Sequence, residues 1–528
     1  MSSAPTPQTV REIADGYAFT GPALDLGAVL LDGTAYPDAQ VRVPLGVLNR
    51  HGLVAGATGT GKTKTLQLIA EQLSAQGVPV FLADIKGDVS GIAAPGAPSE
   101  RTAGRAAEVG QQWTPQGCPV EFYSLGGQGA GIPIRATVTS FGPLLLAKVL
   151  ELNETQEASL SLVFHYADRK GLELYDLKDL TAVIGFLTSP EGKEELRTIG
   201  GLSAATAGVI LRTLTLLENE GAGAFFGEPE FDTAELLRTT PDGRGVVSVL
   251  ELPALQDRPR LFSTFLMWLL ADLYQELPEV GDPDRPKLVF FFDEAHLLFK
   301  GASKAFLEAI TQTVRLIRSK AVGIFFVTQT PRDVPGDVLA QLGNRVQHAL
   351  RAFTPDDAKA LKATVSTFPR SPYDLGTVLT SLGTGEAVVT VLSEKGAPTP
   401  VAATRLRAPQ SLMGPIEAGA LQAAVDASPL TARYREAIDR ESAYEKLAAR
   451  APRPEATPAE PPAPARPPEP SEPPAPSGRP RREEAAGAGG LLGSLLSNPA
   501  VKSFARSAGR QLGQEISRSL FGTSKRRR

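Results

Sequence analysis

Residues 53–76 of the chain, LVAGATGTGKTKTLQLIAEQLSAQ, decide its fold. An apolar, strand-like run, Leu53–Ala55, leads into a glycine-rich loop, and an amphipathic helix is expected over Lys64–Gln76. The loop, residues 56–63, has the spacing G-x-x-x-x-G-K-T, in which glycines let successive backbone N–H groups point at phosphate oxygens. The order strand, loop and helix is the setting that this motif requires, so the stretch predicts a nucleotide-binding P-loop.

The residue types in the loop indicate which groups would hold a nucleotide. Lys62 would reach the β- and γ-phosphates, Thr63 would reach a magnesium ion, and the amino end of the following helix would add its dipole. A chance glycine-rich turn with this spacing is expected about once in a hundred chains of this length. We therefore expect ATP and Mg2+ as cofactors, with nucleotide contacts from Gly56, Ala57, Thr58, Gly59, Thr60, Gly61, Lys62, Thr63 and Lys64.

Short apolar, β-branched runs alternate with helical stretches from Val41 to about Leu406, which is typical of a parallel sheet covered by helices. The fold class that this pattern predicts is α/β. Between Gly142 and Phe226 the pattern changes to Leu- and Ala-rich stretches at helical spacing, which we interpret as a helical insertion. The expected strands are Leu53–Ala55, Val78–Ala83, Val120–Tyr123, Val246–Leu250, Leu288–Phe292, Ile324–Thr328, Val346–Leu350 and Ala387–Leu392.

A chain of 528 residues is long for one compact core, so we expect one large domain with appendages. Proline makes up 13 of the 30 residues in 451–480, a composition that buries little and predicts a stiff, disordered linker. The expected divisions are a short N-terminal segment (1–45), the nucleotide-binding domain (46–410, with the insertion at about 142–226), a helical extension (411–450), the linker (451–488) and an amphipathic C-terminal helix with a basic end (489–528).

Composition narrows the possible classes of protein. The formal charge is −4, with 54 Lys and Arg against 58 Asp and Glu, so nothing global indicates wrapping of a polyanion. The single cysteine, Cys118, cannot form an internal disulfide, and with four scattered histidines it makes no usual zinc-binding spacing. The N-terminus does not resemble a secretion signal, and no run approaches the roughly 18 apolar residues of a membrane span. We expect a cytoplasmic protein with no integral membrane segment.

An acidic pair provides the second half of the expected site. The apolar run Leu288–Phe292 ends in Asp293 and Glu294, and the carboxyl ends of strands are where open α/β sheets bind ligands. Asp293 would hold Mg2+ through water or Thr63, and Glu294 would polarise the attacking water. The alternative, which stays open at this point, is that the pair caps a helix beginning near Ala295.

Two further polar residues end strands on the same expected edge of the sheet. Gln329 follows the run Ile324–Thr328 and could contact both the γ-phosphate and water as a sensor, or could simply be a polar residue leaving the sheet. Asp84 ends the strand after the P-loop helix, and it is either close to the magnesium ion or a turn-forming aspartate.

Arginines are harder to place, because an arginine finger is often supplied by a neighbouring subunit. Arg315 and Arg318 lie three residues apart on one helix face, which an ordinary solvated face explains equally well. Arg345 and Arg351 flank another expected strand. All four are candidates for the finger.

Four stretches of the chain resemble the bacterial HerA-like ATPases of the HerA/FtsK superfamily. They are LADIKGDVSG (82–91), FFDEAHLLF (291–299), GIFFVTQTPRDVP (323–335) and GNRVQHALRAFTPDD (343–357). The order of P-loop, Asp-Glu and Thr-Gln is that of the additional-strand P-loop ATPases. The resemblance covers about residues 20–410 and recurs in the tail at SRSLFG.

The resemblance implies a RecA-like domain that assembles as a ring, commonly a hexamer, with ATP between subunits and arginine fingers acting in trans. It also implies movement along double-stranded DNA. Two departures matter, since residues 1–45 are too few for the N-terminal β-barrel of HerA and no separate DNA-reading domain is visible. Two functions therefore stay open, namely a DNA translocase or helicase-like motor, and a non-motor assembly or switch ATPase whose C-terminal helix binds a protein partner.

Overall fold

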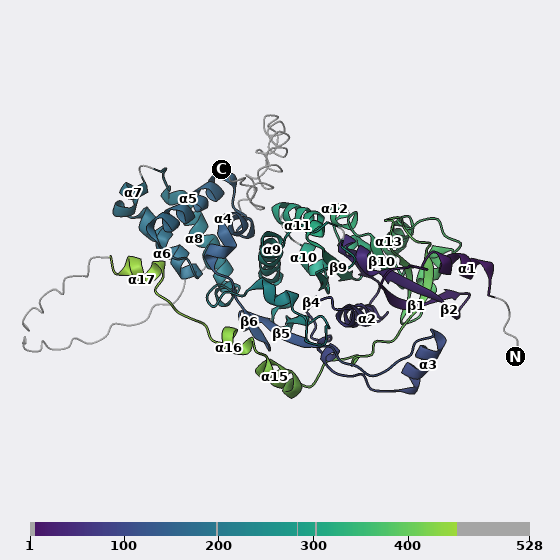
Figure 1. Ribbon diagram of the computed structural model, residues 1–528. Coiled ribbons are helices and arrows are strands. Elements are labelled where there is room, and N and C mark those ends of the chain that lie inside the picture. The colour runs from purple at the N-terminus through teal and green to yellow at the C-terminus, as the bar shows by residue number, and fades with distance from the viewer. Residues whose placement is uncertain (1–5, 197–198, 282, 301, 303, 451–528) are drawn as a thin grey trace, which may run out of the picture. The chain divides into compact units, whose positions relative to one another are not determined.

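The computed structural model describes residues 6–196, 199–281, 283–300, 302 and 304–450 (Figure 1). The chain divides into two units, Met1–Leu447 and Ala448–Arg528, and the fold below is that of the first. The expected proline-rich linker, 451–488, and the expected C-terminal helix, 489–528, lie outside the described residues. Among the helices in the described part of the chain, none is both long enough and apolar enough to cross a membrane.

A twelve-stranded sheet in the order β2-β1-β12-β11-β10-β3-β9-β8-β4-β7-β5-β6 organises the first unit. From β10 to β6 every neighbouring pair is parallel. The central strands are apolar and fully buried, as strands covered by helices on both faces must be. These parallel strands are β10 (Asn344–His348), β3 (Gly52–Ala55), β9 (Val322–Thr328), β8 (Leu288–Phe292), β4 (Val80–Asp84), β7 (Val247–Glu251), β5 (Val120–Leu125) and β6 (Ile132–Ile134).

The predicted α/β class with a mainly parallel sheet is confirmed, although four strands were not expected from the sequence. Three of them, with β11 (Glu386–Thr390), form an antiparallel wing beside β10. β1 (Ala23–Leu31) and β2 (Thr34–Pro44) form a hairpin within the expected N-terminal segment, and β12 (Ala402–Leu406) joins that hairpin to β11. Within the expected N-terminal segment, residues 23–44 therefore extend the sheet. β2 is half exposed and irregular in register, which explains its weak sequence pattern.

Helices cover the sheet (Figure 1). The P-loop helix, α2 (Lys62–Ala75), begins two residues before the expected start, and ten of its residues are buried. α9 (Pro259–Glu276) packs an aromatic cluster in which Trp268 lies against Phe225 and Phe265. The other helices of this part are α1 (Gln8–Asp15), α3 (Glu100–Glu108), α10 (His296–Phe299), α11 (Lys304–Ile317), α12 (Gly336–Leu339), α13 (Pro355–Val365) and α14 (Leu375–Ser381).

The expected helical insertion contains five helices between β6 and β7. Side-chain caps fix where several of them begin, and both Asn153 and Asp176 make reciprocal capping boxes. α4 bends at Gly142, whose φ of 74° lies in the left-handed region, just before Pro143. The five helices are α4 (Val138–Val149), α5 (Glu154–Lys170), α6 (Leu177–Thr188), α7 (Pro190–Leu196) and α8 (Ala204–Asn219).

Residues 407–447, which we call the C-terminal strap, run from the P-loop helix to the insertion. Near its start, Ser411 bonds to Gln67 of α2. Near its end, the Ser442 hydroxyl and the Tyr444 N–H both donate to Asp179 of α6. The strap carries α15 (Ala418–Ala427), α16 (Thr431–Tyr434) and α17 (Ala443–Ala448).

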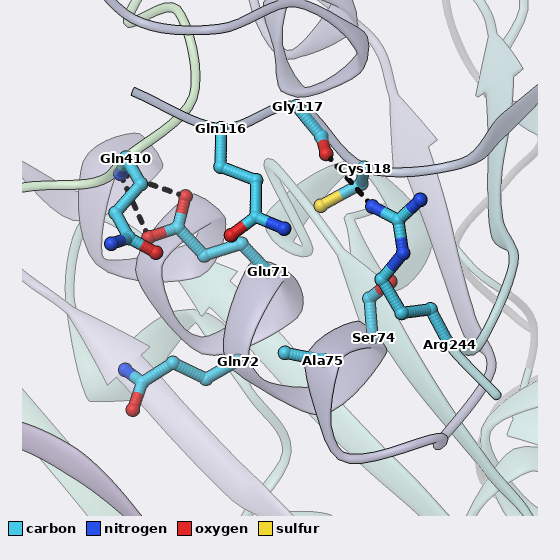
Figure 2. A pocket seen from close by; sticks show the side chains of 9 residues that line it. All are labelled: Glu71, Gln72, Ser74, Ala75, Gln116, Gly117, Cys118, Arg244 and Gln410. Carbon is cyan, nitrogen blue, oxygen red and sulfur yellow. Dashed lines mark hydrogen bonds between the residues drawn. The ribbon is translucent and has the colours of Figure 1, made fainter. Parts of the chain in front are cut away.

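A buried carboxylate joins α2 to the strap beside a small cavity of about 40 Å³ (Figure 2). Glu71 accepts N–H bonds from Gln410 and Ser411 and a hydroxyl bond from Ser411 at 2.9 Å. Burial raises the pKa of Glu71 to about 7 despite these bonds. Burial likewise raises the pKa of Cys118, which lines the same cavity, to about 12, so its sulfur stays a thiol of low reactivity.

The Glu71→Gln variant should lose less stability than the wild type as the pH rises from 5 to 8. The pKa of Glu71 is raised on folding from 4.5 to about 7. The contribution of Glu71 to the free energy of unfolding is therefore fully present below pH 4.5 and is lost as the pH rises through about 7. The expected difference between the two proteins is on the order of 1–3 kcal/mol. Urea unfolding at several pH values measures it, with exposed Glu436→Gln as the control. Parallel pH curves for wild type and Glu71→Gln would contradict this assignment.

Candidate active site

The phosphate loop lies at the carboxyl end of β3, between the carboxyl ends of β9 and β10. The Gly56 N–H donates to the Thr328 carbonyl at 3.2 Å, and the Ala57 N–H donates to the Ala349 carbonyl at 2.8 Å. A Cβ atom at Gly56 would come within 2.4 Å of the His348 Cβ, so only glycine fits there. Both neighbouring strands therefore fix the path of the loop.

Lys62 and His348 hold the first turn of α2 against the loop. The Lys62 Nζ donates to the carbonyls of Gly56 at 2.7 Å and Ala57 at 3.2 Å. Burial lowers the pKa of Lys62, while the carboxylates of Glu294 and Asp293 oppose that shift. The His348 Nε2 lies 2.8 Å from the Thr65 hydroxyl, and burial, with the charge of Lys62, lowers the pKa of this histidine to about 4. His348 is therefore a neutral packing and hydrogen-bonding group.

Asp293 is a buried carboxylate, and one of its two oxygens is not hydrogen-bonded within the described part of the chain. It is 2% exposed, and its Oδ1 accepts the Glu294 N–H at 2.8 Å. Its Oδ2 has no hydrogen-bond partner among the residues that the structure describes. Burial raises the pKa of Asp293 to about 7. A buried oxygen without a donor fits a cation, and Mg2+ prefers carboxylate oxygens. Asp293 would thus hold the ion, and Thr63, on the first turn of α2, would share it.

Glu294 is bonded to Lys86 and lies beside His296. Its Oε1 forms an ion pair with the Lys86 Nζ, and its Oε2 lies 3.1 Å from the His296 Nδ1. Burial alone would raise the pKa of Glu294, but the hydrogen bond and charge of Lys86, with the charge of His296, lower it overall. Its φ of 46° is unusual for a residue other than glycine. Glu294 is therefore an ionised carboxylate with a constrained backbone.

The alternative interpretation of the acidic pair as a helix cap is not supported. α10 begins at His296, its N-cap is Ala295, and no side chain caps it. The Asp293 Oδ1 bonds to the next residue in the chain instead of to the first turn of the helix.

Gln329 lies just beyond β9 in an open cleft of about 500 Å³ that it shares with His296, Lys300 and Arg332. The same cleft contains Asp333, whose Oδ2 accepts the Thr328 hydroxyl at 2.7 Å and the Thr330 N–H at 3.0 Å. These bonds fix the turn that carries Gln329.

Asp84 forms a turn at the end of β4. Its two oxygens accept the backbone N–H groups of Lys86, Gly87 and Val89, at 3.2, 2.8 and 2.8 Å. This geometry favours the turn-forming interpretation of Asp84, because these bonds occupy both oxygens. The turn is what places Lys86 beside Glu294.

Three of the four candidate arginines lie at the edge of the sheet opposite the phosphate loop. Arg318 precedes the amino end of β9, and its charge adds to burial in lowering the pKa of His51, which precedes β3. Arg315 is in the last turn of α11, and Arg345 is near the amino end of β10. These three cannot reach a nucleotide on their own chain. Arg351, exposed beyond the carboxyl end of β10, lies on the side of the loop.

Sequence reasoning missed several residues that the structure brings to this edge, namely Lys86, His296, Arg332, Asp333 and His348. All five stand inside the four stretches that resemble the HerA-like proteins. Their local signal is weak, because a lysine in a turn or a histidine at a strand end is usually structural. Only the pairing of β8 with β4 and with β9 shows which of them meet.

The comparison with protein families decides where the chain belongs. Residues 30–528 match the family described as "Helicase HerA-like C-terminal". The chain belongs to this HerA-like family. The resemblance inferred from the four sequence stretches is thereby confirmed.

Solved structures to which this chain is similar include that of a bacterial conjugative coupling protein. The bacterial conjugative coupling protein TrwBΔN70 gives a TM-score of 0.50 at 16% identity, over 76% of this chain and 93% of that chain. TrwB in complex with the ATP analogue ADPNP gives a TM-score of 0.48 at 15% identity, over 75% of this chain and 97% of that chain. VirB4 of Thermoanaerobacter pseudethanolicus gives a TM-score of 0.44 at 14% identity, over 74% of this chain and 97% of that chain. At such identities the TrwBΔN70 match shows the fold alone, a RecA-like P-loop domain. A search of curated proteins found no relative.

Replacing Lys62 by alanine should weaken nucleotide binding by about ten- to hundredfold, the loss expected when one charged hydrogen-bond donor is removed. Titration calorimetry with Mg2+ and ATP measures the effect. Lys359→Ala removes the same charge at an exposed position of α13, outside the phosphate loop, and should bind like the wild type. Unchanged affinity in a folded Lys62→Ala protein would mean that the loop does not bind phosphates.

Proposed function

We propose that this HerA-like protein hydrolyses ATP with Mg2+ at the site formed by the phosphate loop, Asp293 and Glu294. One observation carries the proposal: the buried Asp293, with Oδ2 unpaired among the described residues, ends β8 at the same edge of the sheet as the phosphate loop after β3, although more than two hundred residues separate it from Lys62. Phosphate-binding lysine, metal-binding carboxylate and ionised base thus meet at one edge of the sheet, as phosphoryl transfer requires.

The residues divide the reaction among themselves. Lys62 and the loop N–H groups hold the β- and γ-phosphates, and Asp293 with Thr63 holds the metal, whose chemistry is to neutralise phosphate charge. Glu294 accepts a proton from water while the water oxygen bonds to the γ-phosphorus. The bond to the β,γ-bridging oxygen breaks, and ADP and phosphate result. Gln329, at the mouth of the cleft, orients the water.

We further propose a ring-forming motor, a hexamer by family resemblance, that moves double-stranded DNA. Membership in the HerA-like family supports this. The geometry adds a reason for a ring, because Arg315, Arg318 and Arg345 lie at the far edge of the sheet and could act only on the nucleotide of a neighbour. A cytoplasmic location and a protein partner for residues 489–528 stay predictions.

Duplex DNA should stimulate the ATPase activity, and the stimulation should decline as the salt concentration rises, because phosphate contacts release counterions. A coupled ATPase assay with and without duplex DNA, at several salt concentrations, measures this effect, with Lys62→Ala as the inactive control. ATPase activity that ignores DNA at every salt concentration would instead support the non-motor alternative, a nucleotide-dependent assembly or switch ATPase, which the acidic pI of 5.8 also favours.

The Glu294→Gln variant should bind ATP and retain it uncleaved. Loss of the general base typically lowers the rate by about 10²- to 10⁴-fold, whereas binding depends on the loop and the metal. Single-turnover hydrolysis and retention of radiolabelled ATP on a filter measure the two effects. Wild-type turnover by Glu294→Gln would refute the role given to Glu294.

A further inference from the structure

The turn between β4 and the following 3-10 helix places a lysine inside the candidate active site. Asp84 anchors this turn through the N–H groups of Lys86, Gly87 and Val89. Gly87 has a φ of 74°, and a Cβ there would come within 2.9 Å of the Pro253 Cγ. The backbone at Lys86 is therefore fixed, and its side chain contacts Glu294, which follows β8.

Lys86 meets the general base of the proposed reaction. Its Nζ forms an ion pair with the Glu294 Oε1. The Lys86 side chain is 45% exposed whereas that of Glu294 is 6% exposed, so the lysine reaches solvent and the glutamate is buried. Burial alone would lower the pKa of Lys86, but the hydrogen bond to Glu294, with the charges of Glu294 and Asp293, raises it.

Lys86 and Lys62 lie at the same edge of the sheet, since Lys86 follows the carboxyl end of β4 and Lys62 begins the helix after β3. Burial, and to a smaller extent the positive charge of Lys86, lower the pKa of Lys62. Two lysine charges that repel one another are costly unless an anion lies between them. Glu294 and Asp293 supply part of that negative charge in the absence of nucleotide, but Lys62 already donates to two loop carbonyls.

The ion pair also restrains Glu294. A base that activates water needs an oxygen free to accept the proton. Lys86 occupies Oε1, whereas Oε2 lies beside His296 and has no hydrogen-bond partner among the residues that the structure describes. A γ-phosphate bound by Lys62 would bring two or more negative charges next to Lys86. The lysine would then exchange a carboxylate partner for a phosphate, which leaves Glu294 Oε1 free for water.

We propose that Lys86 is a second phosphate-binding cation of the site, which contacts the γ-phosphate of ATP and, without it, is paired with Glu294. This inference rests on the proposed ATPase function. Lys86 would then distinguish ATP from ADP, since ADP has no γ-phosphate for it to contact. A purely structural ion pair between Lys86 and Glu294 would show no such preference between nucleotides.

The test compares the affinities of a non-hydrolysable ATP analogue and of ADP, each with Mg2+, by titration calorimetry on the full chain. Lys86→Gln should weaken the analogue about tenfold or more while leaving ADP nearly unchanged, because one charged hydrogen bond to the γ-phosphate is lost. Lys86→Arg keeps the charge and should retain part of the preference. Lys359→Gln, on exposed α13, is the matched control for loss of one lysine charge.

A second arm leaves Lys86 intact. In Glu294→Gln the competing carboxylate is gone, so the preference for the ATP analogue over ADP should increase, and adding Lys86→Gln should remove the increase. Equal losses for both nucleotides in Lys86→Gln, or no increase in Glu294→Gln, would overturn the assignment of Lys86. A wild-type protein that binds neither nucleotide would instead overturn the proposed function itself, so the two failures are distinguishable.

Discussion

Two backbone hydrogen bonds hold the phosphate loop to the sheet, and the rest of the site depends on them. They run from Gly56 to Thr328 and from Ala57 to Ala349, and each acceptor lies at the end of a strand that flanks β3. Because neighbouring parallel strands are locked in register, the loop cannot shift without disturbing both. A nucleotide thus meets a loop that is already ordered, and little conformational entropy has to be lost on binding.

The carboxyl edge of the sheet combines buried acids of opposite electrostatic character. Burial dominates at Asp293 and at Glu251, and it raises the pKa of each to about 7. At Glu294, next in the chain to Asp293, the contact with Lys86 prevails over burial and lowers the pKa. This difference supports the separate roles that we propose for the two adjacent residues, Asp293 as a metal ligand and Glu294 as a charged base. The difference comes from the turn after β4, not from the acidic pair itself.

The fold was largely predictable because its central strands are apolar, short and buried on both faces. The expected strand Leu288–Phe292 matches β8, and the P-loop gave the position of α2 to within two residues. The hairpin β1–β2 was missed because a half-exposed, bulged edge strand lacks a clean pattern. Within the site, motif residues such as Lys62 could be named from spacing. Lys86 could not, because its partner is 208 residues away and only the β4–β8 pairing joins them. Which arginines lie on the side of the phosphate loop could not be predicted without knowing the direction of each strand in the sheet.

The C-terminal strap connects the helical insertion to the P-loop helix, α2, without passing through the sheet. Glu71 and Gln67 of the P-loop helix form hydrogen bonds with residues 410–412, near the start of the strap. Near its end, Ser442 of the strap is bonded to α6. Between them, the Tyr434 carbonyl accepts a bond from Arg135 at 2.9 Å. The strap is therefore hydrogen-bonded at both ends and in the middle, and it links α2 to α6 by a single continuous segment of 41 residues or fewer that lies outside the sheet.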